Sequence, residues 1–302
     1  MTTRRRFLAI CASAACLPSI GNATPMYTWQ GTALGARATL RLDHPDAKAI
    51  SARVVAEISR LEDIFSLYRP ESRLQRLNRT GHLTAPPFEL LECLSLADAV
   101  HRASDGKFDP TIQPLWACYA EASMLGKPPT PKRLSKALSQ TGWKQVRFDT
   151  SAIELQSGMA LTLNGIAQGY IADRIAGMLE AEGLTDILID TGEFRALGRQ
   201  PNGRAWPVKL AAGGEVALAA RALATSAPLG TTFDAEARVG HIINPSTGVP
   251  ARALWREISV SAGSAGLADA LSTAACLFET RDAMSRFIAS FKGARIEAVL
   301  SV

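Results

Sequence analysis

The feature that most constrains the fold is the placement of long amphipathic helices between groups of short strands. Apolar residues recur at helical spacing from about residue 46 to 65, and helical segments follow at 88–104 and 166–182. Helices that flank groups of strands favour an α+β fold with mostly antiparallel pairing. A short helix is expected from 74 to 78, and strands at 37–42, 146–148, 153–155, 160–163, 187–189, 208–210, 221–224, 240–243 and 257–260.

The first 23 residues have the order of a secretory signal. Arg4-Arg5-Arg6-Phe7-Leu8 is basic, residues 9–17 are apolar, and small residues lead to a cleavage site at Gly21-Asn22-Ala23. The twin arginine favours export of a folded protein by the twin-arginine route, and therefore a periplasmic location. The apolar run is far shorter than the roughly 20 residues of a membrane-spanning helix. A lipid anchor at Cys16 is a weaker alternative, because the usual leucine three positions earlier is absent.

Charge and cysteine content argue against two other classes of protein. Removal of residues 1–23 lowers the formal net charge from +5 to +2, and no basic patch with interleaved aromatic residues is present, so nucleic acid is not an indicated partner. Cys93, Cys118 and Cys276 are widely spaced, which indicates neither a zinc site nor a disulfide framework. We expect residues 24–302, about 280 in number, to form a large core in one large domain or two intimate ones.

Asp269 and Thr273 are spaced so that a helix would place both side chains on one face. A carboxylate and a hydroxyl offer hard oxygen ligands, which suit Mg²⁺ better than zinc or copper. Upstream, residues 163–170 form a small-residue turn that opens a helix and leaves the backbone accessible to a ligand. Together the two segments could hold a metal against a phosphate, although Asp269 and Thr273 alone could equally form a solvated helix face or a cap. Asp173 could as easily pair with Arg174 or cap a neighbouring loop, and we leave it out of the site.

His241 is the best catalytic candidate among the four histidines, because His44, His82 and His101 lie in polar or helical contexts with no other signal. An imidazole with a pKa near neutrality could take a proton as general base or donate a hydrogen bond to a phosphate. The alternative is a strand histidine that only holds the turn at 244–248.

Five ordered motifs lie at 65–78, 105–115, 164–173, 224–250 and 268–274. In this order and spacing the chain resembles the ApbE family, the FAD:protein FMN transferases, from Gly31 to the C-terminus. The resemblance implies a single α+β domain that binds FAD and Mg²⁺. It also implies transfer of the FMN part of FAD to a Ser or Thr hydroxyl of a partner protein, with release of AMP. Such a reaction needs a cation at the pyrophosphate, a base for the acceptor hydroxyl and a pocket for the flavin and adenine rings.

The resemblance also implies the residues of the site. The metal ligands would be the side chains of Asp269 and Thr273 and the backbone carbonyl of Gly165. Asp109 precedes a proline, so its backbone is biased to an extended form that could present the carboxylate outward, although a turn cap is the alternative. Tyr68 and Phe108 would supply aromatic faces. The full set implied for FAD is Gln30, Tyr68, Lys107, Phe108, Asp109, Thr162, Gln168 and His241.

Four positions depart from the pattern of the family. Gln168 replaces the usual lysine, Thr162 the usual acid, Gln30 the usual methionine and Ala227 a frequent glycine. The first two changes remove an acid and a base together, which keeps the local charge balanced. With the twin-arginine signal, these features resemble the NosX branch, whose members are accessory proteins for nitrous oxide reductase. The acceptor implied for that branch is a membrane-bound, periplasm-facing flavoprotein of the NosR type.

Two alternatives to the transferase remain open. An FAD pyrophosphatase would use water in place of the acceptor hydroxyl and would yield FMN and AMP from the same site. A non-catalytic FAD-binding assembly factor is the other, and the departures at Gln168 and Thr162 keep it open.

Overall fold

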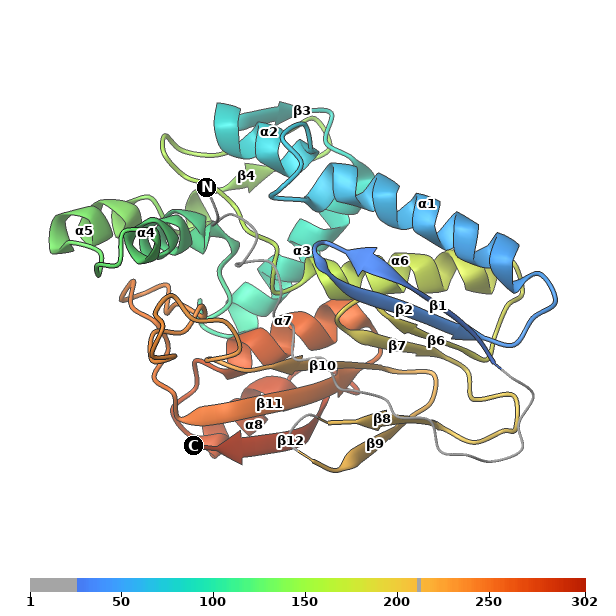
Figure 1. Ribbon diagram of the computed structural model, residues 1–302. Coiled ribbons are helices and arrows are strands. Elements are labelled where there is room, and N and C mark those ends of the chain that lie inside the picture. The colour runs from blue at the N-terminus through green and yellow to red at the C-terminus, as the bar shows by residue number, and fades with distance from the viewer. Residues whose placement is uncertain (1–25, 211–212) are drawn as a thin grey trace.

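The computed structural model describes residues 26–210 and 213–302 (Figure 1). The predicted signal peptide at 1–23, the predicted mature start near Thr24 and the alternative lipid anchor at Cys16 lie outside the described residues. A seven-stranded sheet with the order β1-β2-β6-β7-β10-β11-β12 forms the centre, and each of its neighbouring pairs is antiparallel, which confirms the predicted α+β class. Its strands are β1 (Tyr27–Ala33), β2 (Ala36–Leu42), β6 (Ile187–Asp190), β7 (Phe194–Leu197), β10 (Ala222–Ser226), β11 (Trp255–Ala262) and β12 (Arg295–Ser301).

Strand β6 shows why the sheet is covered on both faces. Ile187 and Ile189 point into the large core beneath the helices, whereas Leu188 between them belongs to a second cluster with Trp206 and Val208. Alternate side chains of a strand face opposite sides of a sheet, so an uninterrupted apolar run requires two covered faces. The second face is covered by a two-stranded hairpin, β8 (Trp206–Lys209) and β9 (Glu215–Leu218).

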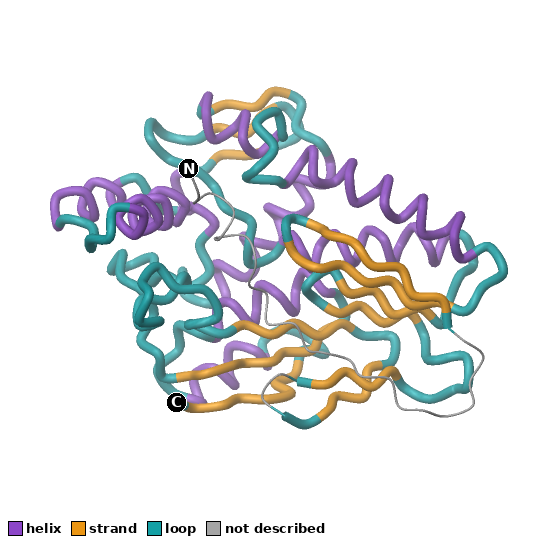
Figure 2. Tube along the Cα trace, in the orientation of Figure 1, coloured by secondary structure: helices purple, strands orange, loops and turns teal. Residues whose placement is uncertain are grey.

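The helices predicted from the sequence gather on one side of the sheet (Figure 2). On the first of them, Ile50, Val54, Ile58, Leu61 and Phe65 form the predicted apolar stripe, and all five are buried. The predicted helices are confirmed with small changes at their ends. They are α1 (Ala47–Phe65), α2 (Arg73–Thr80), α3 (Phe88–Ala103), α6 (Ala167–Ala181) and α7 (Ala265–Ala275).

The polar segment at 121–140 belongs to a pair of helices that projects from the body of the molecule (Figure 1). Leu115 and Tyr119 of this pair pack against Phe233 and Ile243 in a separate small core, which ties the pair to the loops between β10 and β11. The pair is α4 (Gln113–Met124) and α5 (Pro131–Ser139); the remaining elements are β3 (His82–Thr84), β4 (Arg147–Phe148), β5 (Ala152–Glu154), α8 (Arg281–Ala289) and 3₁₀ turns at Pro110–Ile112 and Trp143–Gln145.

The prediction of a strand at 160–163 was wrong, because the described structure has no strand there. The backbone there is satisfied without a neighbouring strand, because the Leu161 N–H donates to the side-chain oxygen of Asn78 (2.7 Å) and the Thr162 N–H donates to the Pro110 carbonyl (2.8 Å). Apolar residues in alternation therefore mark an extended segment here, but its hydrogen-bond partners lie in a helix and a loop.

The strand predicted at 240–243 was also wrong. Gly240 and Ile243 form isolated bridges, to Thr232 and Pro250 respectively. The His241 N–H donates to the Thr231 carbonyl (3.0 Å). The segment is part of a compact loop that folds back on itself, and this loop faces the pocket described below.

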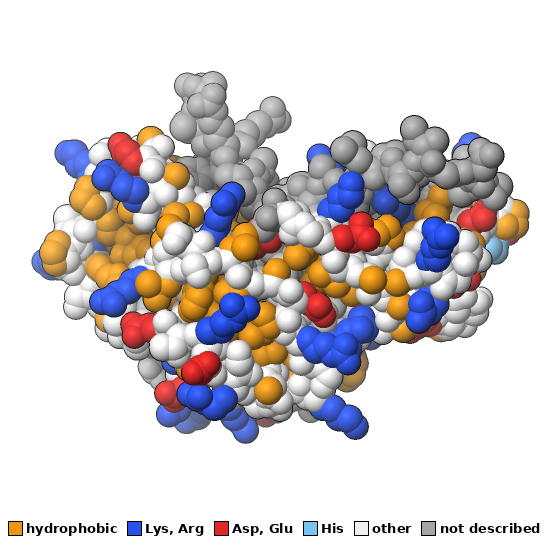
Figure 3. Space-filling model, turned by 90° about the horizontal axis from the view of Figure 1, so that it is seen from below, with side chains coloured by type: hydrophobic (Ala, Val, Ile, Leu, Met, Phe, Trp, Pro, Cys, Tyr) orange, Lys and Arg blue, Asp and Glu red, His pale blue; other side chains and the backbone are white. Residues whose placement is uncertain are grey.

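The surface of the described residues carries few large apolar side chains. The most exposed lie apart, at Val302, at Phe88, and at Met124 and Leu125 where α4 ends. On the face seen in Figure 3, Lys and Arg side chains are scattered between hydrophobic and acidic ones. Within residues 26–210 and 213–302, no helix has both the length and the apolar character needed to cross a membrane.

Candidate active site

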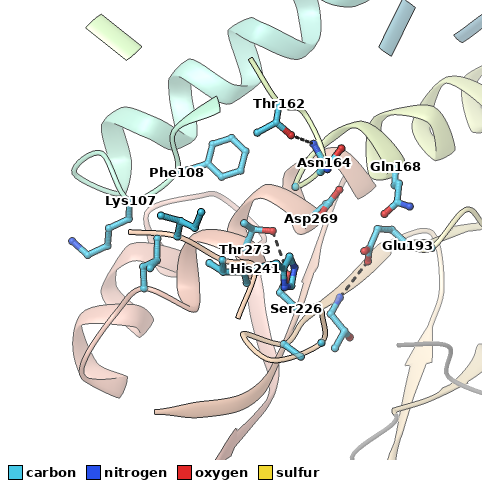
Figure 4. A pocket seen from close by; sticks show the side chains of 18 of the residues that line it. Lys107, Phe108, Thr162, Asn164, Gln168, Glu193, Ser226, His241, Asp269 and Thr273 are labelled. Atoms are coloured by element: carbon cyan, nitrogen blue, oxygen red, sulfur yellow. Dashed lines mark hydrogen bonds between the residues drawn. The ribbon is translucent and has the colours of Figure 1, made fainter. Parts of the chain in front are cut away.

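One pocket brings together segments that are far apart in the sequence (Figure 4). Its walls come from the loop after α3, the turn that opens α6, the β6–β7 turn, the loops between β10 and β11, and α7. Apolar side chains on its walls include Trp116, Phe108, Phe194 and Leu277. Most of the predicted site residues line it, namely Lys107, Phe108, Asp109, Thr162, Gly165, Gln168, His241, Asp269 and Thr273.

Gln30 and Tyr68 are placed elsewhere, and within the described part of the chain they do not line this pocket. Gln30 lies in β1, where it pairs with Thr39 of β2. Tyr68 lies in the loop after α1 with 54% of its surface exposed. The pocket geometry therefore gives no support to these two predicted FAD contacts.

Asp269 is the best buried of the predicted metal ligands. Its side chain is 3% exposed on α7, and the Gly169 N–H approaches one carboxylate oxygen at 3.5 Å, a long hydrogen bond. Burial raises the pKa of Asp269, because the charged form has lost water without gaining strong hydrogen bonds. A buried carboxylate in this state favours a bound cation.

Gly165 and Thr273 touch closely enough to exclude a side chain on the glycine. A Cβ at Gly165 would lie 2.9 Å from the Thr273 hydroxyl oxygen and 3.0 Å from its methyl carbon. The same hydroxyl is 3.3 Å from the hydroxyl of Ser226 on β10. Glycine is therefore the residue that allows the turn before α6 to approach α7.

These residues fit a hard divalent cation. Among the described residues, no three His, Cys, Asp or Glu side chains converge as a metal site. The candidate set consists instead of one carboxylate, one hydroxyl and one backbone carbonyl, from Asp269, Thr273 and Gly165. Such an oxygen set is typical of Mg²⁺, which keeps several water ligands and takes others from substrate phosphates.

Glu193 is a site residue that the sequence reasoning missed. It follows the β6 strand, lines the pocket and is only 7% exposed. One of its carboxylate oxygens accepts a hydrogen bond from the Thr225 N–H (3.2 Å). Burial, followed by the negative charges of Asp269 and Asp190, raises the pKa of Glu193 well above its usual range. Two buried acids in one pocket increase the electrostatic benefit of a bound cation. The signal in the sequence that could have indicated Glu193 is an acid directly after Gly192, close to the end of a buried strand.

His241 lies on the pocket wall with its ring anchored to the backbone. Its Nδ1 is 3.1 Å from the Thr231 carbonyl oxygen. Burial lowers the pKa of His241, while the carbonyls of Thr231 and Pro228 act in the opposite direction. A neutral imidazole that donates from Nδ1 has its lone pair on Nε2, which suits a base. The same anchor also fits the alternative role of holding its own loop.

The carboxylate of Asp109 serves as a turn cap. One oxygen accepts from the Thr111 N–H (2.7 Å) and hydroxyl (2.6 Å), and the other accepts from the Trp143 N–H (3.2 Å). The capping alternative is thus present even though Asp109 lines the pocket. The Thr162 hydroxyl likewise accepts from the Asn164 N–H (3.3 Å).

A protein-family model described as the ApbE family matches residues 32–300. The chain belongs to the ApbE family. The family predicted from five motifs is therefore confirmed, and the match covers most of the described chain.

Relatives and solved structures agree with the ApbE assignment. An FAD:protein FMN transferase of Chlamydia muridarum is 27% identical over 235 residues, which cover 73% of each chain. One of Haemophilus influenzae is 27% identical over 258 residues, covering 78% of this chain and 72% of the relative. The crystal structure of the apo form of Pseudomonas stutzeri flavinyl transferase ApbE matches with a TM-score of 0.78 at 23% identity, covering 91% of this chain and 94% of that chain. At this identity the structural match shows a shared fold.

The two roles of His241 in this ApbE-family chain predict different results for His241→Ala. Loss of a general base lowers turnover on the order of a hundredfold to ten-thousandfold with FAD affinity little changed. Loss of a ligand contact weakens FAD binding and turnover together, and we expect the binding effect to be the larger share because the loop at 240–250 faces the pocket. Titration of FAD fluorescence beside single-turnover AMP release separates the two. Wild-type rate and affinity would remove His241 from the site.

Proposed function

We propose that this ApbE-family chain is an FAD:protein FMN transferase that uses Mg²⁺ and FAD to modify a Ser or Thr hydroxyl of an acceptor protein and releases AMP. The observation that carries the proposal is that Asp269, Thr273 and Gly165 line one pocket together with aromatic and aliphatic side chains. Such walls suit flat rings, and the oxygen set suits a cation beside a pyrophosphate. The names of the relatives point to the same reaction.

In the proposed reaction, the acceptor hydroxyl oxygen forms a bond to the phosphorus on the FMN side of the pyrophosphate. The bond from that phosphorus to the bridging oxygen breaks, and AMP leaves with the bridging oxygen. Mg²⁺, when bound, would neutralise charge on the pyrophosphate and on the departing AMP.

The residues of the chain supply orientation and a place for the proton. Lys107 lines the pocket, although its ammonium lies over the Phe278 ring (4.9 Å to the centroid), so its charge would act on a phosphate-bearing substrate only at a distance. Trp116 and Phe108 offer ring faces against which a flavin or adenine can pack. Neutral His241, with Nε2 unprotonated, is the candidate to accept the hydroxyl proton.

One incubation separates this function from its two alternatives. Purified mature protein is mixed with FAD and Mg²⁺, with and without the flavin-binding domain of a NosR-type protein, and AMP is quantified. Acceptor-dependent AMP is expected for the transferase. AMP that forms equally without acceptor would indicate a pyrophosphatase, and FAD binding without AMP would indicate an assembly factor.

We further propose that the protein acts in the periplasm and belongs to the NosX branch, with a membrane-bound flavoprotein of the NosR type as its acceptor. The support is the twin arginine at Arg4-Arg5, the apolar run that follows it and the departures at Gln168 and Thr162.

Replacement of Arg4 and Arg5 together by lysine is expected to block export, because the twin-arginine route depends on the arginine pair. Cell fractionation and the size of the processed chain measure the effect, and a co-expressed protein with a general secretory signal serves as control. Unchanged periplasmic accumulation of the double variant would contradict the proposed route.

A further inference from the structure

Helices α6 and α7 are in backbone contact where each begins. A Cβ on Gly169 of α6 would lie 2.2 Å from the carbonyl oxygen of Ala265 and 2.6 Å from the amide nitrogen of Gly266. A Cβ on Gly266 would in turn lie 3.3 Å from the amide nitrogen of Tyr170. Each helix therefore presents a glycine to the other, and the first turn of α7 rests on the first turn of α6 without side chains between them.

Asp173 binds the first turn of α7 one helical turn beyond this contact. One of its carboxylate oxygens accepts from the Ala265 N–H and the other from the Gly266 N–H, both at 2.8 Å. These N–H groups are among the first four of α7, which have no partner within their own helix. The next one, of Leu267, donates to the side chain of Ser264. Asp173 thus fixes both the position and the direction of the start of α7.

The charge on Asp173 is maintained despite its burial. Burial raises the pKa of Asp173 to about 6, while the N–H groups of Ala265 and Gly266 and the cation of Arg195 act against the rise. The Arg195 guanidinium nitrogen lies 3.3 Å from the carboxylate. Asp173 is therefore mostly ionised at neutral pH and accepts both bonds.

The proposed metal ligands lie on the two helices that Asp173 joins. On α7, Asp269 lies one turn and Thr273 two turns beyond Ala265, whose N–H binds Asp173. Gly165 lies in the turn that opens α6. A shift or rotation of α7 against α6 would move two ligands away from the third. Mg²⁺ tolerates little of this, because it requires near-octahedral oxygens at about 2.0–2.1 Å.

We propose that Asp173 is a positioning residue for the metal: it fixes the start of α7 on α6 and so keeps Asp269 and Thr273 aligned with Gly165. The inference rests on the proposed Mg²⁺-dependent function. It assigns Asp173 no contact with substrate or metal.

The test compares Asp173→Asn with the wild-type mature chain. The amide has nearly the same shape but only one acceptor oxygen, so one of the two bonds to α7 is lost. Mn²⁺ serves as the probe, and its free concentration is followed by electron paramagnetic resonance without FAD. We expect the Mn²⁺ dissociation constant to rise about tenfold to a hundredfold, as for other residues that orient metal ligands. The Mg²⁺ concentration for half-maximal AMP release should rise in parallel, while FAD binding without divalent ions stays unchanged.

Thr280→Ala is the matched control. Thr280 caps the start of α8 through its bond with the Ala283 N–H, so its loss weakens a helix start that contributes no proposed ligand. We expect this variant to lower the melting temperature and to leave Mn²⁺ affinity unchanged. Wild-type Mn²⁺ affinity in Asp173→Asn, or a loss no larger than in Thr280→Ala, would overturn the inference.

Two further measurements keep the outcome decisive. If Asp173→Asn does not fold, Asp173→Glu keeps the charge but displaces the carboxylate from the Ala265 and Gly266 N–H groups, and unchanged Mn²⁺ affinity in that variant would overturn the inference. If the wild-type chain binds no Mn²⁺ and releases AMP without divalent ions, the proposed metal site itself fails, and this inference fails with it.

Discussion

Replacement of Asp269 by asparagine is expected to abolish FMN transfer without loss of the fold. The change removes the only formal charge among the three proposed metal ligands, so Mg²⁺ binding and AMP release should fall by more than about 100-fold. The metal-free variant should melt at or above the wild-type temperature. The reason is that a buried carboxylate beside Glu193 costs free energy that a neutral amide does not.

Two variants serve as comparisons for Asp269→Asn. Thr273→Ala should have a milder effect, since a neutral hydroxyl contributes less to cation binding and water can replace it. Asp282→Asn, an exposed position on α8, should leave both activity and Mg²⁺ dependence unchanged. Near-normal turnover of Asp269→Asn at limiting Mg²⁺ would show that the metal assignment is wrong.

The second large effect is expected from Gly169→Ala. The added methyl would lie 2.2 Å from the Ala265 carbonyl oxygen, and backbone on both sides leaves no flexible side chain to move away. The α6–α7 contact must therefore open, at a cost of about 1–3 kcal/mol or more. At roughly 2–4 °C per kcal/mol for a domain of this size, the melting temperature should fall by several degrees. Mg²⁺-dependent AMP release should fall too, because the same contact aligns the proposed ligands.

Gly177→Ala is the control on the same helix. Gly177 is exposed on α6, and among the described residues no atom lies within 4 Å of the position its Cβ would take. Alanine should stabilise the helix by roughly 0.5–1 kcal/mol relative to glycine. If Gly169→Ala were as stable and as active as Gly177→Ala, the close approach of α6 and α7 would not be a property of the folded protein.

The long helices could be predicted from the sequence because their apolar spacing is carried by many residues. The stripe from Ile50 to Phe65 repeats over the whole of α1, so no single residue decides it. Strand β12 was missed although Arg295 and Glu297 alternate with Ile296, which is a strand signal in a segment with no motif. The segment at 160–163 shows the opposite error, because local alternation does not reveal that Asn78 will take the place of a neighbouring strand.

The site was predictable where a motif had chemistry of its own, as with the pair Asp269 and Thr273. Glu193 was not predictable in this way, because the sequence places it 76 positions from Asp269 and only the antiparallel sheet and α7 bring the two acids into one pocket. Gln30 and Tyr68 came from the family resemblance alone, and the structure places them outside the pocket lining that it describes.

The most direct test of the proposed function examines the acceptor itself. The mature chain is incubated with FAD, Mg²⁺ and the flavin-binding domain of a NosR-type protein. The acceptor is then denatured, and its intact mass and flavin fluorescence are measured. The proposed function predicts an acceptor heavier by one FMN group, with one AMP released per modified molecule, and no modification after alanine replaces the acceptor Ser or Thr. An unmodified acceptor beside accumulated AMP would contradict it.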